Sequence, residues 1–418
     1  MAKIVLATFG SLGDLHPMIA LALELRSRGH SVVISTWDGY AEKIALLGFE
    51  FVPLRPQVDP EDREFIKKAM DGREGSATVI REMILPYLSE MYVDLAAACE
   101  GADVMITGEL IYVAKSLHEK TGIKWVTTCL SPLTLFSFND PGIYPGAEFL
   151  EYLRPLPAIF HRALFGLMRL TIMGWLDPYR EFRRSLGLDP DHDPIFFGKF
   201  SDDLHLLMFS RTLAAPQPDW PKRAVQTGFC FYDGQEDEGK MPNGLREFLD
   251  AGEPPIVFTL GSAAVMDARD FFDESAKTAK SLGRRAILLY GRDNTPPKGL
   301  DENVVGFEYA PFSLVFPRAV CVVHQGGVGT TGQVLRAGVP HVIMPYGHDQ
   351  PDNAARCRRI GVAEIIPRDN YNARSAAAEL TRIFKNPVYA DKAKILSKIV
   401  QSEGGTTAAC DAIERILK

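Results

Sequence analysis

The sequence lacks several features that would assign a protein to a class at once. No two of its six cysteines form a C-x-x-C pair, and several lie in apolar runs such as residues 320–323. This pattern predicts reduced, buried thiols rather than a disulfide framework or a zinc site. No stretch of ~18 uncharged apolar residues occurs, so no helix is expected to span a bilayer. Lysine and arginine (46) are outnumbered by aspartate and glutamate (53), which argues against a nucleic-acid-binding protein.

The N-terminus also lacks a targeting pattern. The chain starts at once as an apolar run over residues 4–9, with neither a basic n-region nor an A-x-A cleavage site. We therefore expect no signal peptide and a cytoplasmic location. The chain has 418 residues, of which 46% are apolar and 24% charged. At ~100–200 residues per domain, this length and composition predict two globular domains.

The first half alternates strand and helix patterns. Residues 3–9 are predicted as a strand, residues 10–14 as a turn, residues 17–28 as a helix and residues 32–36 as the next strand. Such a unit implies a parallel, right-handed crossover. Further strands are expected at 104–107 and 125–129, with a helix over 112–121 between them.

The second half repeats this alternation. Short apolar runs of strand length are found at residues 256–260, 286–290, 320–324 and 342–345. Continuous apolar strands between helices indicate sheets covered on both faces. The fold class predicted is α/β, with two doubly wound, Rossmann-like domains facing each other across a cleft. The expected divisions are an acceptor domain at 1–212, a linker region at 213–245, a donor domain at 246–390 and a final helix at 391–418.

A glycine-rich loop follows the predicted strand at 320–324. It reads His324-Gln-Gly-Gly-Val-Gly-Thr-Thr-Gly-Gln333. Glycines allow backbone N–H groups to approach a ligand closely, and the helix that follows adds free donors and a partial positive charge. The loop therefore suits a diphosphate, with His324 and Thr330 as further donors. The alternative is a tight strand-to-helix turn that needs glycine only for its geometry.

A second alternative is a dinucleotide site. Gly327, Gly329 and Gly332 spell G-x-G-x-x-G, and Asp349 lies about twenty residues further on, where such sites hold a ribose. This would make the protein a nicotinamide-dependent oxidoreductase. Three features count against it: His324 directly precedes the loop, Gln350 follows the acid, and the unit lies in the second half of the chain.

The chain resembles the family 1 glycosyltransferases, which have the GT-B fold. The stretches that carry the resemblance are Gly10-Ser-Leu-Gly-Asp14-Leu-His-Pro17, Tyr309-Ala-Pro, the loop from His324, Ala337-Gly-Val-Pro340 and His348-Asp-Gln350-Pro-Asp-Asn353. Among these enzymes it is most similar to rhamnosyltransferases of the rhamnolipid type. The resemblance implies transfer of a hexose or deoxyhexose from a nucleoside diphosphate, of the dTDP-rhamnose or UDP-glucose type, to a lipophilic small molecule.

The resemblance also implies roles for individual residues. Tyr309 would stack on the donor base, and Asp349 and Gln350 would bind sugar hydroxyls. His324 would donate to a phosphate oxygen. The diphosphate would be held by Gly261, Ser262, Gly326, Gly327, Gly329 and Thr330. Neither a metal nor a cofactor is expected.

Two positions depart from the family pattern. Gln325 stands where many bacterial relatives have a second histidine. Gly332 replaces the acid that plant relatives use on the ribose, so ribose recognition is left unexplained.

Transfer to a hydroxyl also needs a general base from the opposite domain. By the resemblance this base is Asp14, and direct displacement with one base would invert the anomeric centre. His16, whose unperturbed pKa of ~6.5 is nearer neutral, is the competing candidate. The alternative for Asp14 is an N-cap of the following helix. We expect His16 and Phe136 to contact the acceptor.

Three other features of the sequence allow a functional interpretation. The three acids in 189–193 could form a metal site, but two prolines and the absence of the calcium-loop spacing favour a solvated loop. The apolar stretch 158–176 with its basic edge could rest on a membrane or wall an acceptor pocket, against an ordinary partly buried helix. A non-catalytic, nucleotide-sugar-binding accessory protein is the other function considered; Asp14, His324 and the Asp349-Gln350 pair argue against it.

Overall fold

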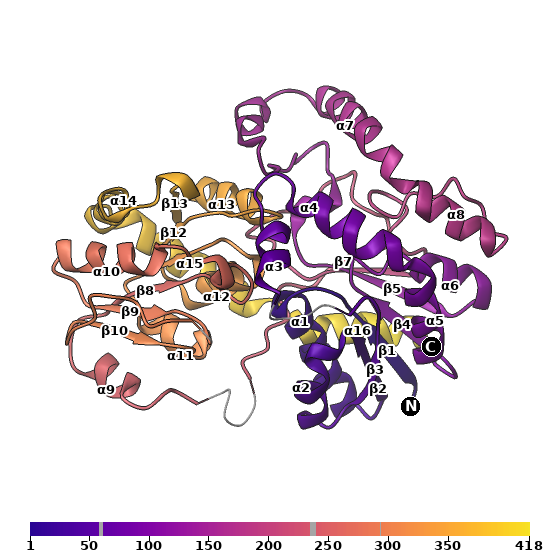
Figure 1. Ribbon diagram of the computed structural model, residues 1–418, viewed down its shortest axis with the longest axis horizontal. Coiled ribbons are helices and arrows are strands. Elements are labelled where there is room, and N and C mark those ends of the chain that lie inside the picture. The colour runs from indigo at the N-terminus through magenta and orange to yellow at the C-terminus, as the bar shows by residue number, and fades with distance from the viewer. Residues whose placement is uncertain (58–61, 235–239, 293) are drawn as a thin grey trace.

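The protein contains two parallel sheets, each with helices on both faces (Figure 1). The computed structural model describes residues 1–57, 62–234, 240–292 and 294–418. In the described residues the first sheet has the order β3-β2-β1-β4-β5-β6-β7 and the second the order β10-β9-β8-β11-β12-β13. All paired strands in both sheets are parallel. This architecture confirms the predicted fold class.

The strands are short and consist largely of buried apolar residues. Those of the first sheet are β1 (Lys3–Ala7), β2 (Ser31–Thr36), β3 (Glu50–Pro53), β4 (Val104–Thr107), β5 (Lys124–Cys129), β6 (Leu204–Leu207) and β7 (Ala224–Gln226). Those of the second are β8 (Ile256–Thr259), β9 (Ala286–Leu289), β10 (Val304–Phe307), β11 (Cys321–His324), β12 (His341–Ile343) and β13 (Ala363–Ile365). All eight strands expected from the sequence are present, and most of their ends agree within a residue or two.

The helices fill the connections between the strands. They are α1 (Leu12–Ser27), α2 (Ala41–Leu46), α3 (Arg63–Ala69), α4 (Gly75–Thr78), α5 (Leu88–Ala98), α6 (Ala114–Thr121), α7 (Ala158–Ile172), α8 (Asp177–Ser185), α9 (Leu245–Asp250), α10 (Phe271–Ser281), α11 (Phe312–Val315), α12 (Val328–Ala337), α13 (Gln350–Arg359), α14 (Ala373–Lys385), α15 (Val388–Ser402) and α16 (Gly405–Leu417).

Alternate residues of each strand enter different cores. In β1, Val5 packs with residues of α5, α6 and α8 on one face of the sheet, and Ile4 and Leu6 pack with α1 and α16 on the other. A further core joins the domains, since Leu207 and Phe229 of the first half pack with Leu335 and Cys357 of the second. The two domains therefore share an apolar core.

The end of the chain differs from the single helix expected over 391–418. Two helices are present: α15 packs near α12, and α16 crosses back to the first domain, where it lies beside α1 (Figure 1). The break lies at Glu403 and Gly404. Gly405 has φ +48°, and its N–H donates to the carbonyl of Thr227 at 2.8 Å. No strand pattern follows this segment in the sequence, so only the tertiary contacts show which domain it covers.

Two other elements differ from expectation. Helix α1 begins at Leu12, five residues before the predicted start, because Ser11 caps it and opens the helix inside the expected turn. Strand β7 lies within the predicted linker of 213–245 and forms the edge of the first sheet. Part of that linker, residues 235–239, lies outside the described residues.

Candidate active site

Asp14 lies in the first turn of α1, directly after β1. Ser11 is the N-cap: its hydroxyl accepts from the Gly13 N–H at 3.1 Å, while Asp14 Oδ2 accepts from the Ser11 N–H at 2.8 Å and from the Ser11 hydroxyl at 3.2 Å. This reciprocal pattern is a capping box. Asp14 is thus not the N-cap itself, and the helix start holds its carboxyl in a fixed position.

The Asp14 carboxyl is half-buried, and its protonation is perturbed. Burial raises its pKa to about 6, against the lowering effect of the two Ser11 hydrogen bonds, and the negative charge of Glu109 adds to the rise. Gly10 leaves the space that this carboxyl occupies: its φ is +132°, and a Cβ there would lie 2.4 Å from Asp14 Oδ2. The turn before α1 therefore needs glycine at position 10 for Asp14 to keep its place.

The glycine-rich loop joins β11 to α12 as predicted. Gly326 has φ +90°, and a Cβ there would lie 2.8 Å from a methyl group of Ile343. Gly327 is the N-cap of α12, whose first N–H groups can receive an anion. Thr330 is buried in the first turn, and a Cβ on Gly329 would meet open space. The backbone of this loop thus has the form of an anion-binding turn.

Gln325 connects this loop to the turn after β8. A Cβ on Gly261, which has φ +66°, would lie 2.4 Å from Gln325 Nε2, and one on Gly327 would lie 2.8 Å from the same atom. The Gln325 amide therefore packs between the two turns that the sequence assigns to the diphosphate. Ser262, the other residue expected there, is exposed.

His324 differs from its predicted role as a donor to phosphate. Its ring is fully buried; Nδ1 accepts from the Gly326 N–H at 3.0 Å, and Nε2 lies 3.0 Å from His341 Nδ1. The first contact puts the His324 proton on Nε2, so this atom donates to His341. Burial lowers the pKa of His324 well below its ordinary value, and that of His341 to about 3. A neutral ring whose two nitrogens both form hydrogen bonds within the protein does not suit the predicted contact with a phosphate oxygen. It instead holds the glycine-rich loop through the Gly326 N–H.

Asp349 precedes α13 at the carboxyl end of β12. Its Oδ2 accepts from Asn353 Nδ2 at 2.8 Å. Burial raises the pKa of Asp349 to about 7, opposed by this hydrogen bond and assisted by the negative charges of Asp14 and Asp352. Asp14, in the other domain, is therefore near enough for its charge to affect the protonation of Asp349.

The residues beside Asp349 are also fixed by the fold. Gln350 is buried, and its Oε1 accepts from the Tyr346 N–H at 2.8 Å, which leaves its amide nitrogen for the predicted sugar contact. His348 has φ +55°, a left-handed conformation that is unusual for a residue with a side chain. Its Nδ1 lies 3.1 Å from the hydroxyl of Ser76 in α4. The contact between Ser76 and His348 thus holds the loop that carries Asp349 against the first domain.

The residues expected to contact the acceptor lie in two separate places. The ring of Phe136 packs at 5.0 Å from Phe196 and 5.4 Å from Phe165 of α7. The ring of His16 packs instead against Tyr232 at 5.0 Å. Phe136 therefore belongs to an aromatic cluster, which we define as Phe136, Phe138, Phe165, Phe196 and Phe197. Tyr309, the expected partner of the donor base, follows β10 and is 42% exposed.

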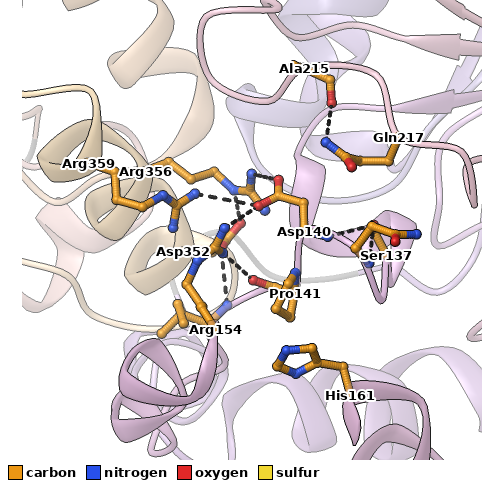
Figure 2. A network of polar contacts seen from close by, with 12 residues as sticks. Ser137, Asp140, Pro141, Arg154, His161, Ala215, Gln217, Asp352, Arg356 and Arg359 are labelled. Atoms are coloured by element: carbon orange, nitrogen blue, oxygen red, sulfur yellow. Dashed lines mark hydrogen bonds and ion pairs between the residues drawn. The ribbon is translucent and has the colours of Figure 1, made fainter. Parts of the chain in front are cut away.

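Buried ion pairs tie the loop after Phe138 to α13 (Figure 2). Arg356 is 1% exposed; its Nε donates to Asp352 at 2.6 Å, and its guanidinium also pairs with Asp140 of the first domain. Asp352 in turn accepts from the Ile143 N–H at 3.0 Å, and Arg154 also pairs with Asp140. Helix α13, which begins beside Asp349, is thus held to the loop of the first domain that follows Phe138.

The comparison with known proteins agrees with this arrangement. Residues 4–137 match the glycosyltransferase family 28 N-terminal domain, and residues 289–413 match the erythromycin biosynthesis protein CIII-like C-terminal domain. Over 428 residues the chain is 31% identical to O-mycaminosyltylonolide 6-deoxyallosyltransferase of Streptomyces fradiae, covering 99% of this chain and 97% of that protein. The chain belongs to the family 1 glycosyltransferases of the GT-B fold.

Other proteins similar to this glycosyltransferase extend the comparison. It is 29% identical to vancomycin aglycone glucosyltransferase of Amycolatopsis orientalis, over 99% of this chain and 98% of that one. The solved structure of the glycotransferase of kitacinnamycin matches with a TM-score of 0.73 at 23% identity, covering 100% of this chain and 99% of that one. The family agrees with the sequence-based resemblance, and a hexosyltransferase is favoured over an oxidoreductase. The narrower likeness to rhamnosyltransferases stays a prediction.

Three remaining expectations concern metals and surfaces. Among the described residues no group of three or more His, Cys, Asp or Glu side chains could hold a metal ion; that the glycosyltransferase needs none stays a prediction. In 189–193, Asp189 and Asp191 are exposed, but Asp193 is buried and accepts from the backbone N–H of Ile195. Within the described ranges no helix is long and apolar enough to cross a membrane. Of the residues of α7 only His161 is fully buried, and the membrane-surface hypothesis for this helix stays untested.

Sequence reasoning missed several residues that complete the site. Asn353 lies in the motif that starts at His348, but its contact with Asp349 is not predicted from the sequence. Gly10 lies in the motif around Asp14, and its role in placing that carboxyl is not predicted either. Phe165 and Phe196 are far from Phe136 in the chain. A glycine four residues before a predicted acid, and an Asn one helical turn after another acid, were signals available in the sequence. No sequence signal joins the phenylalanines, because their contact is tertiary.

Proposed function

We propose that this glycosyltransferase moves a hexose or deoxyhexose from a nucleoside diphosphate to a hydroxyl of a lipophilic small molecule, with inversion at the anomeric carbon and with Asp14 as the general base. The observation that carries the proposal is that Asp14 and Asp349, from opposite domains, are near enough for negative charge on Asp14 to raise the pKa of Asp349. Asp14 follows β1 of the expected acceptor domain, and Asp349 follows β12 of the expected donor domain.

The chemistry balances with these groups. Asp14 takes the proton of the acceptor hydroxyl as the oxygen of that hydroxyl attacks the anomeric carbon. The bond from the anomeric carbon to the diphosphate oxygen breaks, and the diphosphate leaves with the bonding electrons. A carboxyl whose pKa is about 6 is largely ionised at neutral pH and is still basic enough to accept a proton in the transition state. The N–H groups at the start of α12 would stabilise the charge on the leaving diphosphate.

The donor is proposed from both the site and the relatives. Tyr309 would stack on the base, the turns at Gly261–Ser262 and Gly326–Thr330 would hold the diphosphate, and Asp349 and Gln350 would bind the sugar. One similar enzyme is named as a 6-deoxyallosyltransferase and another as a glucosyltransferase, and a spinosyn rhamnosyltransferase with a TM-score of 0.67 was solved with thymidine diphosphate. We therefore propose a dTDP-deoxyhexose or UDP-glucose donor.

The acceptor is proposed to be largely apolar. The aromatic cluster lies in the first domain and presents Phe197 at 44% exposure. Relatives are named for a tylonolide, a vancomycin aglycone and a sterol. Aromatic faces of this kind bind rigid apolar rings through area burial and stacking.

A ligand panel tests the proposal. Thermal unfolding is measured with TDP, UDP, GDP and NAD, because a ligand at ~100 times its dissociation constant adds ~2.7 kcal/mol to the free energy of unfolding. A rise in Tm with TDP or UDP, followed by sugar transfer from the matching donor to a hydroxylated polyketide or sterol, is the expected result. A rise with NAD alone, and no release of diphosphate with any donor, would contradict it.

A further inference from the structure

Asn353 lies where three parts of the site meet. It is fully buried in α13, one helical turn after Asp349. Its Nδ2 donates to Asp349 Oδ2 at 2.8 Å and to the carbonyl of Gly326 at 2.9 Å. Its Oδ1 accepts from the hydroxyl of Ser131, just after β5 of the first domain, at 3.4 Å. One amide therefore joins the expected sugar-binding carboxyl, the diphosphate loop and the acceptor domain.

The chemistry of these contacts requires an amide. Both Nδ2 hydrogens are used, one on a carboxylate oxygen and the other on a backbone carbonyl, and the remaining oxygen accepts from a hydroxyl. Leucine has nearly the same shape but would leave Asp349 and the Gly326 carbonyl without this donor. A serine at this position would be too short to reach both acceptors.

We propose that Asn353 is a positioning residue for sugar transfer: it fixes the Asp349 carboxyl relative to the diphosphate loop at Gly326 and to the first domain at Ser131. The inference rests on the proposed function, in which Asp349 binds the sugar and the loop binds the diphosphate. A sugar held by one and a leaving group held by the other must keep a constant separation, and a displacement of ~1 Å can cost ~10²-fold in rate.

The charges around Asp349 define a readout that a purely structural role would not change. Asp14 from α1 and Asp352 from α13 raise the pKa of Asp349, and the Asn353 amide lowers it. The adjacent His348 has a pKa below its ordinary value, because burial favours the neutral ring. Loss of the amide donor should therefore raise the pKa of Asp349 further, since the two negative neighbours remain.

The experiment measures this pKa in the full-length protein without substrate. Aspartate labelled with ¹³C at Cγ is titrated by NMR, and Asp349→Asn assigns the resonance. In Asn353→Leu the pKa of Asp349 should rise above its wild-type value, and kcat with the sugar donor should fall by at least ~10-fold. The Kd of the free nucleoside diphosphate should change by less than ~3-fold, because the loop backbone still receives it.

Two further variants keep the test decisive. Asn353→Ala also removes the amide donor to Asp349 and replaces Asn353→Leu if that protein does not fold. Ser131→Ala is the matched control: it removes only the contact to Oδ1, so the pKa of Asp349 should stay at the wild-type value. An unchanged pKa in a folded Asn353 variant overturns the inference and leaves the proposed function intact. A wild-type protein that binds no nucleoside diphosphate overturns the proposed function instead.

Discussion

Asp14 and Asp349 interact across the boundary between the two domains, and the negative charge of Asp14 raises the pKa of Asp349. Each carboxyl follows a parallel strand, β1 for Asp14 and β12 for Asp349. Each is also held by its own helix start: Ser11 donates to Asp14, and Asn353 donates to Asp349. Two half-buried acids that approach each other in this way cannot both ionise freely, so their protonation is coupled.

This coupling predicts the pH profile of transfer. Asp14 must be ionised to act as a base, and its pKa is raised to about 6, so kcat/KM should rise with pH through about 6. Asp349, whose pKa is about 7, is largely protonated over that range, so Asp349→Asn should leave the rise close to pH 6. The profiles are measured at subsaturating acceptor. A rise that moves well below pH 6 in Asp349→Asn would show that Asp349 is already ionised when Asp14 titrates.

Substitution of the proposed base should abolish most turnover. In Asp14→Asn, kcat should fall by ~10²–10⁴-fold because no group takes the acceptor proton. The Kd for the nucleoside diphosphate should be unchanged, since Asp14 belongs to the other domain. His16→Gln is the matched control for the competing base: its ring packs on Tyr232, so kcat should be largely retained. The reverse ranking of the two variants would assign the base to His16.

The raised pKa of Asp14 also has a consequence for stability. A carboxyl whose pKa is higher in the folded than in the unfolded protein stabilises the fold at low pH, and that contribution is lost as pH rises from about 4 through about 6. Asp14→Asn should therefore raise the free energy of unfolding at pH 8 by up to roughly 3 kcal/mol, with little change at pH 4. Urea unfolding at both pH values measures this; an equal effect at both would show that the pKa is not shifted.

Gly10 should be essential for the position of Asp14. In Gly10→Ala the new Cβ would lie 2.4 Å from Asp14 Oδ2 and displace the carboxyl, so kcat should fall by ~10-fold or more. Gly29→Ala is the control, because Gly29 also has a positive φ, +88°, but nothing lies within 4 Å of the added Cβ. Both substitutions therefore strain the backbone, but only Gly10→Ala should lower the activity. Similar losses in both variants would assign the effect to strain.

The buried ion pairs between the domains should matter for folding. Arg356→Met leaves the buried Asp352 without its cationic partner, while Asp140 keeps Arg154, and this should cost about 3–5 kcal/mol of unfolding free energy. The exposed pair of Arg318 and Asp250 offers a control; Arg318→Met should cost no more than ~1 kcal/mol. Both are measured by urea denaturation at constant ionic strength. Equal costs would mean that burial of the Arg356 network is energetically unimportant.

The fold was predictable to the extent that local pattern defines it. Apolar runs predicted eight strands. Four of the five missed strands, β3, β7, β10 and β13, lie at sheet edges, and β3 and β7 carry no fully buried residue, whereas the buried inner strand β6 was also missed. Edge strands are exposed on one side, so their composition resembles that of loops. The start of α1 was missed because its capping box, Ser11 with Asp14, lies inside the glycine-containing stretch that was predicted as a turn.

The candidate site was predictable wherever the backbone alone defines the chemistry. The sequence by itself determined the glycine turns at Gly10, Gly261 and Gly326, the helix start after Gly327, and the acids that follow strands. The tertiary structure alone decided what each side chain does there. It buried His324 against His341, joined Phe136 to Phe165, and brought Asp14 to Asp349 and Asn353 to Ser131. The physical reason is range: backbone conformation depends on neighbouring residues, whereas burial, pKa and hydrogen-bond partners depend on groups that the chain brings together only when it folds.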